Sequence, residues 1–163
     1  MCSYLIAILG VLIAVFFWRA AKGAVRSMDS LSGPLSDLLK RGYNCGFLII
    51  KIGYSNKRFL LLRKYINGPG NYGIQLAFPK AKWSLPYFDS VRSVCIGRHP
   101  TSCVVDDGVL DFLYVDFGKD VSEATECIKE ILREVFGVTE STKLFVKLEN
   151  ATVEDKLIDA PLV

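Results

Sequence analysis

Three residues near the middle of the chain have side chains that bind transition metals. Cys95, His99 and Cys103 follow one another at intervals of four residues. Zinc prefers thiolate and imidazole ligands, but a tetrahedral site takes four, and structural sites favour two cysteines separated by two residues. The fourth ligand would have to come from Cys127 or from an acid such as Asp106. Buried cysteines also behave as small apolar residues, so core cysteines beside a surface histidine explain the pattern more simply. We therefore predict no metal and no cofactor.

Two short motifs match nucleotide-binding signatures. Residues 68–73 spell G-x-G-x-x-G, and residues 116–118 spell D-F-G. The dinucleotide motif requires a helix directly after the loop, whereas the residues from Tyr72 onward have the pattern of a strand. A kinase also requires an H-R-D loop, a paired lysine and a much longer chain. The single histidine of the sequence, His99, has no nucleophile motif beside it. We predict no catalytic residue and a protein that is not an enzyme.

The most apolar segment of the sequence lies at its start. Tyr4–Trp18 has no charged residue and, with its small flanking residues, reaches the length that crosses a bilayer core. A secretory signal peptide would have basic residues before the apolar run, and a core helix would have a polar face. The segment therefore predicts an uncleaved transmembrane helix. Its aromatic residues would lie at the membrane interfaces: Tyr4, Phe16, Phe17 and Trp18.

Basic residues follow that segment and predict its orientation. They favour the cytoplasmic side, so we expect the N-terminus outside and the domain in the cytoplasm, in a bacterial inner membrane. The five cysteines are an odd number without a paired framework, as in a reducing compartment. The same basic residues are candidates for contact with anionic lipid headgroups: Arg19, Lys22, Arg26, Lys40 and Arg41.

The hydrophobic periodicity predicts an α+β domain after the anchor, with an antiparallel or mixed sheet and helices packed on one face. Asp120 and Glu123 have the spacing of a capping box at the start of the clearest helix. Residues 19–28 are expected to continue the N-terminal helix. We expect strands at 47–54, 58–66, 72–78, 102–105, 109–117 and 143–148, and helices at 85–96 and 121–136. The predicted organisation is an anchor with a basic juxtamembrane segment (1–27), a linker with a short helix (28–45), the domain (46–150) and a C-terminal tail (151–163).

Residues 58–148 resemble type III secretion chaperone-like domains of bacteria. The features that carry the resemblance are the runs RFLLLRKYI and YGIQLAF, the helix after Trp83, and the block EATECIKEILREVFGV. The resemblance implies a small α+β binding module, often dimeric, without catalytic residues. It implies no particular binding residue.

These observations together favour a membrane-anchored cytoplasmic interaction module without catalytic activity, such as an adaptor, an accessory subunit or an immunity-type protein. The expected partners are the membrane and another protein, and a homodimer is a further possibility. We expect no binding to nucleic acid. Two alternatives remain. One is a peripheral domain that binds lipid headgroups, and the other is a small metal-binding protein that uses Cys95, His99 and Cys103.

Overall fold

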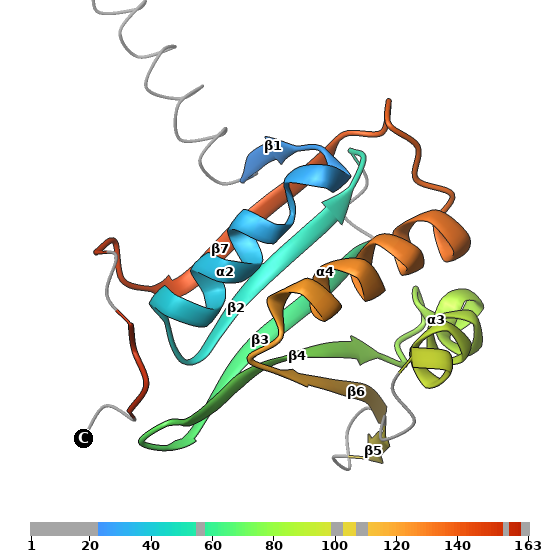
Figure 1. Cartoon of the computed structure of the whole chain (residues 1–163). Coiled ribbons are helices and arrows are strands. Elements are labelled where there is room, and N and C mark those ends of the chain that lie inside the picture. Colours follow the sequence, from blue (N-terminus) through green and yellow to red (C-terminus); the bar gives the residue numbers. More distant parts are fainter. Residues whose placement is uncertain (1–22, 55–57, 99–102, 107–110, 155–156, 161–163) are drawn as a thin grey trace, which may run out of the picture.

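The computed structural model describes residues 23–54, 58–98, 103–106, 111–154 and 157–160, with the side chains of 103–106 left out. Groups of strands and single helices follow one another along these residues (Figure 1). The strands are β1 (Ala24–Arg26), β2 (Gly42–Ile52), β3 (Phe59–Gly68), β4 (Asn71–Pro79), β5 (Cys103–Asp106), β6 (Asp111–Gly118) and β7 (Leu144–Ala151). The helices are a short 3-10 turn at Met28–Ser30, α2 (Ser32–Arg41), α3 (Leu85–Arg98) and α4 (Val121–Glu130), which continues as a π-helical turn over Ile131–Val135.

The described strands form one antiparallel sheet in the order β1-β7-β2-β3-β4-β6-β5. Strands β2, β3 and β4 are joined as successive hairpins, and β7 returns from the end of the domain to pair with β2. In Figure 1, α2 and α4 lie side by side on one face of this sheet, and α3 lies beside the end of α4. The predicted α+β class is confirmed, and the sheet is antiparallel throughout.

The hydrophobic core lies between the helices and this face of the sheet. Buried and partly exposed side chains alternate along the strands, as expected for a half-buried sheet. In β3, Leu60 and Leu62 are fully buried and Leu61 is partly exposed. In α4, Ala124 and Ile128 are fully buried, one turn apart. Asp120 caps this helix by accepting a hydrogen bond from the Glu123 N–H at 2.9 Å, as its sequence position predicts.

Helix α4 ends earlier than the sequence pattern predicts. The apolar spacing predicts a helix to residue 136, but the α-helical part stops at Glu130 and a π-helical turn follows. Within this turn the Phe136 N–H donates to the Ile131 carbonyl at 3.3 Å. Because a π turn keeps the chain helical, the buried positions Ile131 and Leu132 stay in the core.

Among the described residues, no helix is both long and apolar enough to cross a membrane. The longest α-helix among them, α3, has 14 residues, and α4 with its π-helical turn has 15, 10 in the helix and 5 in the turn, where a span needs about 20. The predicted N-terminal transmembrane helix is therefore not found among the described residues, and the single-pass topology and cytoplasmic placement that rest on it are withdrawn. The expected helix over 19–28 is likewise replaced, from Ala24 to Arg26, by strand β1. The predicted anchor residues Tyr4, Phe16, Phe17 and Trp18 lie outside the described residues.

The segment described from sequence as a linker, 28–45, is part of the packed fold. Leu31, Leu35 and Leu38 have no exposed surface and belong to the core. Helix α2 leads directly into β2 at Gly42, where an added Cβ would lie 2.5 Å from the Leu38 carbonyl oxygen. Only glycine therefore permits this tight helix-to-strand junction without a shift of the backbone.

Candidate functional site

The face of the sheet turned away from the helices carries large side chains that the core does not use. We call this surface the open face. Its members alternate with core residues along β2, β3, β4, β6 and β7, and all of them are partly buried except Asp116, which is exposed. They include Phe47, Ile49, Lys51, Leu61, Arg63, Tyr65, Gln75, Phe112, Tyr114, Asp116, Lys147 and Glu149.

The strand register fixes how the apolar part of the open face is assembled. Ile49 on β2 pairs with Leu61 on β3 and with Lys147 on β7. Phe47 pairs with Arg63 and with Glu149. Directly opposed side chains in antiparallel strands lie within contact distance. Phe47, Ile49 and Leu61 therefore form one continuous apolar strip across β2 and β3.

At the β3–β4 hairpin end of the open face the sheet carries a polar hollow of about 330 Å³. It lies where β3, β4 and β6 run side by side. Its lining is made of charged, amide and phenol side chains: Arg63, Tyr65, Asn67, Asn71, Gln75 and Asp116. We call it the polar hollow.

Arg63 is held at the polar hollow by two neighbours without charge. Its guanidinium lies over the ring of Tyr114, 4.7 Å from the ring centroid. With its amide oxygen turned toward Arg63, Gln75 accepts hydrogen bonds from Nε and one Nη of the guanidinium. Tyr114 in turn stacks on Phe112, with centroids 5.6 Å apart. The cation is thus fixed in direction, with no carboxylate partner among the described residues.

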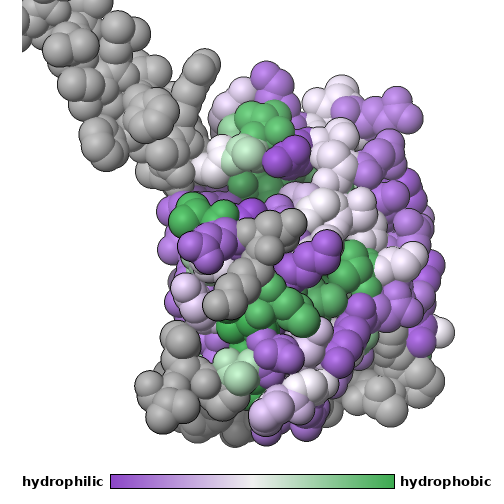
Figure 2. Space-filling view, turned by 60° about the vertical axis from the view of Figure 1, so that its left-hand side comes forward, coloured by the Kyte–Doolittle hydropathy of each residue, from purple (hydrophilic) through white to green (hydrophobic). Residues whose placement is uncertain are grey.

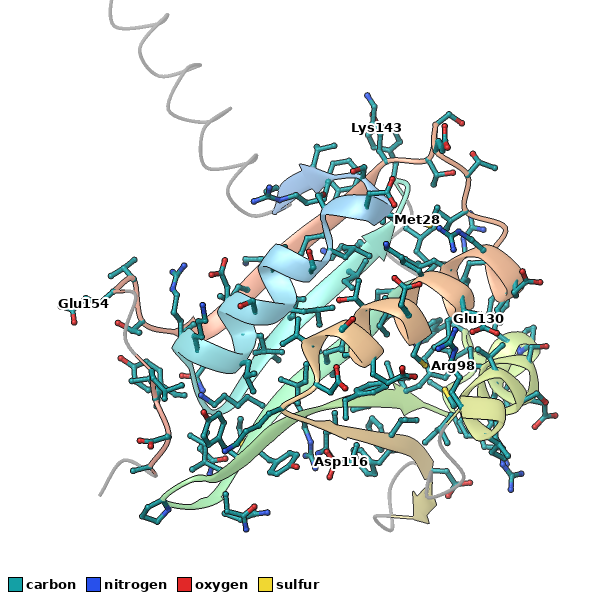
Figure 3. The ribbon with its side chains drawn as sticks, viewed as in Figure 1. Met28, Arg98, Asp116, Glu130, Lys143 and Glu154 are labelled. Atoms are coloured by element: carbon teal, nitrogen blue, oxygen red, sulfur yellow. The ribbon has the colours of Figure 1, made fainter. Side chains whose placement is uncertain are left out.

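Asp116 is also held by neutral groups. The Tyr65 hydroxyl donates to its two carboxylate oxygens, at 2.9 and 3.0 Å, and the Gly118 N–H donates to Oδ1 at 2.8 Å. Figure 3 labels Asp116 beside strand β6. Burial first, and then the bond to Asp116, raise the pKa of Tyr65 from 10.0 to about 12. Both effects disfavour a phenolate beside a carboxylate.

The groups that line the polar hollow are suited to binding a ligand. Nucleophilic or base catalysis needs a group whose pKa is brought toward neutrality, and the pKa of Tyr65 is moved away from it. The hollow instead presents a cation, an anion and amides in fixed positions. The side-chain amides of Asn67 and Asn71 form no hydrogen bond within the part of the chain that the structure describes, so they are available to a ligand.

The structure does not bring the basic residues predicted for lipid contact together. Arg19 and Lys22 lie outside the described residues. Arg26 is in β1, before α2, whereas Lys40 and Arg41 end α2. That helix of ten residues is about 15 Å long. Arg41 donates from Nε to the Thr152 carbonyl at 3.0 Å and pairs with Asp37 at 3.7 Å.

The predicted metal-ligand triplet is partly described. Cys95 is fully buried in α3 and hydrogen-bonds the Cys127 thiol of α4, and this bond with burial raises the Cys95 pKa strongly. His99 lies outside the described residues, as does the side chain of Cys103. The described residues contain no group of three or more His, Cys, Asp or Glu able to hold a metal. Metal binding by the triplet stays a hypothesis.

The contact between Cys95 and Cys127 belongs to a longer line of packing between α3 and α4. Arg98, one turn after Cys95, bridges Glu123 at 3.2 Å and also pairs with Glu130. Figure 3 shows Arg98 and Glu130 pointing toward one another. This arrangement accounts for both cysteines as core residues.

Sequence reasoning missed the residues of the polar hollow. From the sequence, Asp116 stands out only as part of D-F-G, and Arg63 and Tyr65 only as members of a predicted strand. The available signal was the alternation in β3, which puts Leu61, Arg63 and Tyr65 on one face and Leu60 and Leu62 on the other. The pairing of β4 with β6, which brings Asp116 opposite Gln75, has no local signal in the sequence.

No protein-family model, no curated protein and no solved structure matches this chain. The resemblance of residues 58–148 to type III secretion chaperone-like domains stays a prediction.

Proposed function

We propose that this protein is a non-catalytic interaction module that binds a partner protein through the apolar strip of its open face. The observation that supports this is the strip itself, Phe47, Ile49 and Leu61, which no described helix covers. Partly exposed aromatic and aliphatic side chains grouped on one surface are typical of protein interaction sites. The raised pKa of Tyr65, in the neighbouring polar hollow, gives no support to a catalytic role.

The charges around the strip favour a partner segment with acidic residues. Lys51 lies on the open face next to the strip and forms no ion pair among the described residues. Lys147 already has Glu149 at 2.6 Å. An unpaired cation beside an apolar surface is best matched by an apolar segment flanked by aspartate or glutamate. We infer an amphipathic segment of another protein as the occupant.

On the part of the surface that Figure 2 shows, apolar residues do not form one continuous area. In Figure 2, where the left-hand side of Figure 1 is turned toward the viewer, hydrophobic residues form separate patches among hydrophilic ones. Exposed apolar residues outside the open face include Leu85 of α3, at 52% exposure, and Val153, at 93%. Single apolar residues of this kind are normal on protein surfaces. Leu85 therefore provides a matched control for substitutions in the strip.

The test uses the purified protein as bait and compares variants that each carry one substitution changing the surface charge. Ile49→Asp and Leu61→Asp alter the strip, Lys51→Glu reverses the neighbouring charge, and Leu85→Asp is the control. A photo-crosslinking residue at Phe47 identifies the partner segment by mass spectrometry. We expect a stoichiometric partner with an acid-flanked apolar segment, kept by the control and reduced at least about tenfold by each of the other changes.

Three outcomes would contradict the proposal. A partner that the strip variants retain would place the interface elsewhere. A homodimer that Leu61→Asp dissociates in light scattering would make the occupant a second copy of this chain. Bound nucleic acid in place of protein would assign the surface to another class of ligand. Circular dichroism of each variant establishes that the fold is intact before binding is compared.

A further inference from the structure

The polar hollow contains two opposite charges that face the same space without neutralising one another. Arg63 and Asp116 both line it, yet they form no ion pair with each other among the described contacts. Each is instead fixed by neutral groups: Gln75 and the Tyr114 ring for the cation, Tyr65 and a backbone N–H for the anion.

This separation matters because nearby opposite charges on a protein surface ordinarily gain energy by pairing. Strand β4 lies between the two residues, with Gln75 opposite both, and the neutral neighbours fix each charge on its own side, so the site has one positive and one negative end. A ligand gains most from such a site when it carries the complementary pair of charges. Fixing the protein groups in advance also lowers the ordering cost of binding.

From this geometry we propose that the polar hollow binds a small zwitterion, with the chemistry of a free α-amino acid. The ligand carboxylate accepts hydrogen bonds from the guanidinium of Arg63, in the way that carboxylates and guanidinium groups commonly pair. The ligand ammonium donates to Asp116, whose Oδ2 accepts from Tyr65 alone among the described groups. The ligand is bound by charge and hydrogen bonds at both ends.

The remaining lining residues favour a polar side chain on the ligand. The amides of Asn67 and Asn71 border the same hollow and have no partner among the described residues. Leaving such amides unpaired against an apolar group costs free energy. The volume, about 330 Å³, is at the low end of small-molecule sites. We therefore expect amino acids with hydroxyl or amide side chains to bind more tightly than aliphatic ones.

The test is calorimetric titration of the full chain with the free L-amino acids, one at a time. N-acetyl-L-serine, which lacks the ammonium, and L-serinamide, which lacks the carboxylate, are the ligand controls. We expect binding of polar amino acids and, for each derivative, affinity about 10- to 100-fold lower. Arg63→Gln and Asp116→Asn should weaken binding by a similar factor. Asp111→Asn, on the same strand but paired with Lys80 at 3.6 Å outside the hollow, should not.

Each of four results would overturn the proposal of a zwitterion site. Equal binding of N-acetyl-L-serine would make this a site for carboxylates alone, and equal binding of L-serinamide a site for cations alone. Binding that survives both Arg63→Gln and Asp116→Asn would place the ligand elsewhere. No heat with any amino acid, together with no shift of the Gly118 amide resonance in NMR, would exclude a zwitterion site. None of these measurements uses the partner protein, so they test this proposal separately from the proposed function.

Discussion

At the scale of single residues, the arrangement of the polar hollow depends on one glycine. Gly73 pairs across the strands with Tyr65. A Cβ added to Gly73 would lie 2.5 Å from the Tyr65 hydroxyl and 2.7 Å from the Gly118 carbonyl oxygen. The second contact is with backbone, which cannot move aside as a side chain can. The absence of a side chain at residue 73 is thus what lets Tyr65 lie flat and reach Asp116.

We predict that Gly73→Ala destabilises the domain by about 1–3 kcal/mol and displaces Tyr65 from Asp116. Thermal or urea unfolding measures the first effect. Spectrophotometric titration of tyrosine measures the second, because loss of burial and of the bond to Asp116 should lower the Tyr65 pKa from about 12 toward 10.0.

The control is Gly97→Ala in α3, where an added Cβ meets nothing within 4 Å. Alanine favours helices over glycine by up to about 1 kcal/mol, so this variant should be as stable as the wild type or slightly more stable. Equal unfolding curves for Gly73→Ala and the wild type would show that the sheet accommodates the methyl group and that Tyr65 does not need the glycine.

At the scale of elements, the sequence predicts those helices and strands that have a local hydrophobic pattern or cap. It does not predict which strands pair, or in which register. The alternation in β3 and the cap at Asp120 are local signals, and both the strand and the helix start were predicted. Strand β1 has three residues, all exposed, so it has no alternation to detect. The hollow joins Arg63 to Asp116 across 53 positions of sequence, and only the pairing of β3 with β4 and of β4 with β6 brings them together.

Helix α2 is the element whose role differs most from the sequence interpretation. The sequence predicts only one or two helical turns within a linker here, because Gly33-Pro34 and Gly42 bound the short run. Its leucines nevertheless fill the core beside α4. A domain beginning at residue 46 would therefore lack one of the helices that cover the sheet.

We predict that Leu35→Ala lowers the free energy of unfolding by about 2–5 kcal/mol, the usual cost of a cavity at a fully buried leucine. Leu39→Ala, on the same helix but partly exposed, should cost clearly less. Urea denaturation followed by circular dichroism measures both. If the two variants lose equal and small amounts of stability, α2 does not belong to the cooperative core.

At the scale of the whole molecule, the residues that follow β7, here called the C-terminal segment, connect the end of α2 with the buried Lys64 of β3. The Thr152 N–H donates to the Arg41 carbonyl at 2.9 Å, and the Ile158 N–H donates to the Lys40 carbonyl at 2.8 Å. The Lys64 ammonium donates to the Ile158 carbonyl and lies 5.0 Å from the Tyr72 ring centroid. The segment therefore covers Lys64, which has no exposed surface.

Burial of Lys64 makes the stability of the folded protein depend on pH. Burial lowers the Lys64 pKa from 10.5 to about 8, and Asp159 raises it by a smaller amount. Between about pH 8 and 10.5 the unfolded chain holds a proton on this lysine that the folded protein has released. Stability should therefore rise with pH across this window, by up to about 3 kcal/mol. Below pH 8 the full cost of the buried charge is present.

Removal of residues 157–163 should expose Lys64 and flatten this rise, because burial is the larger cause of the lowered pKa. Urea denaturation at pH 7, 8, 9 and 10 measures the slope, and labelling with an amine-reactive ester followed by mass spectrometry measures access to Lys64. Val153→Ala, at a side chain that is 93% exposed in the same part of the chain, should leave both unchanged. Because Lys40 is exposed, its labelling gives the reference rate. If Lys64 stays unlabelled in the shortened chain while Lys40 reacts, the sheet and α2 bury the lysine by themselves, and the C-terminal segment is not what covers it.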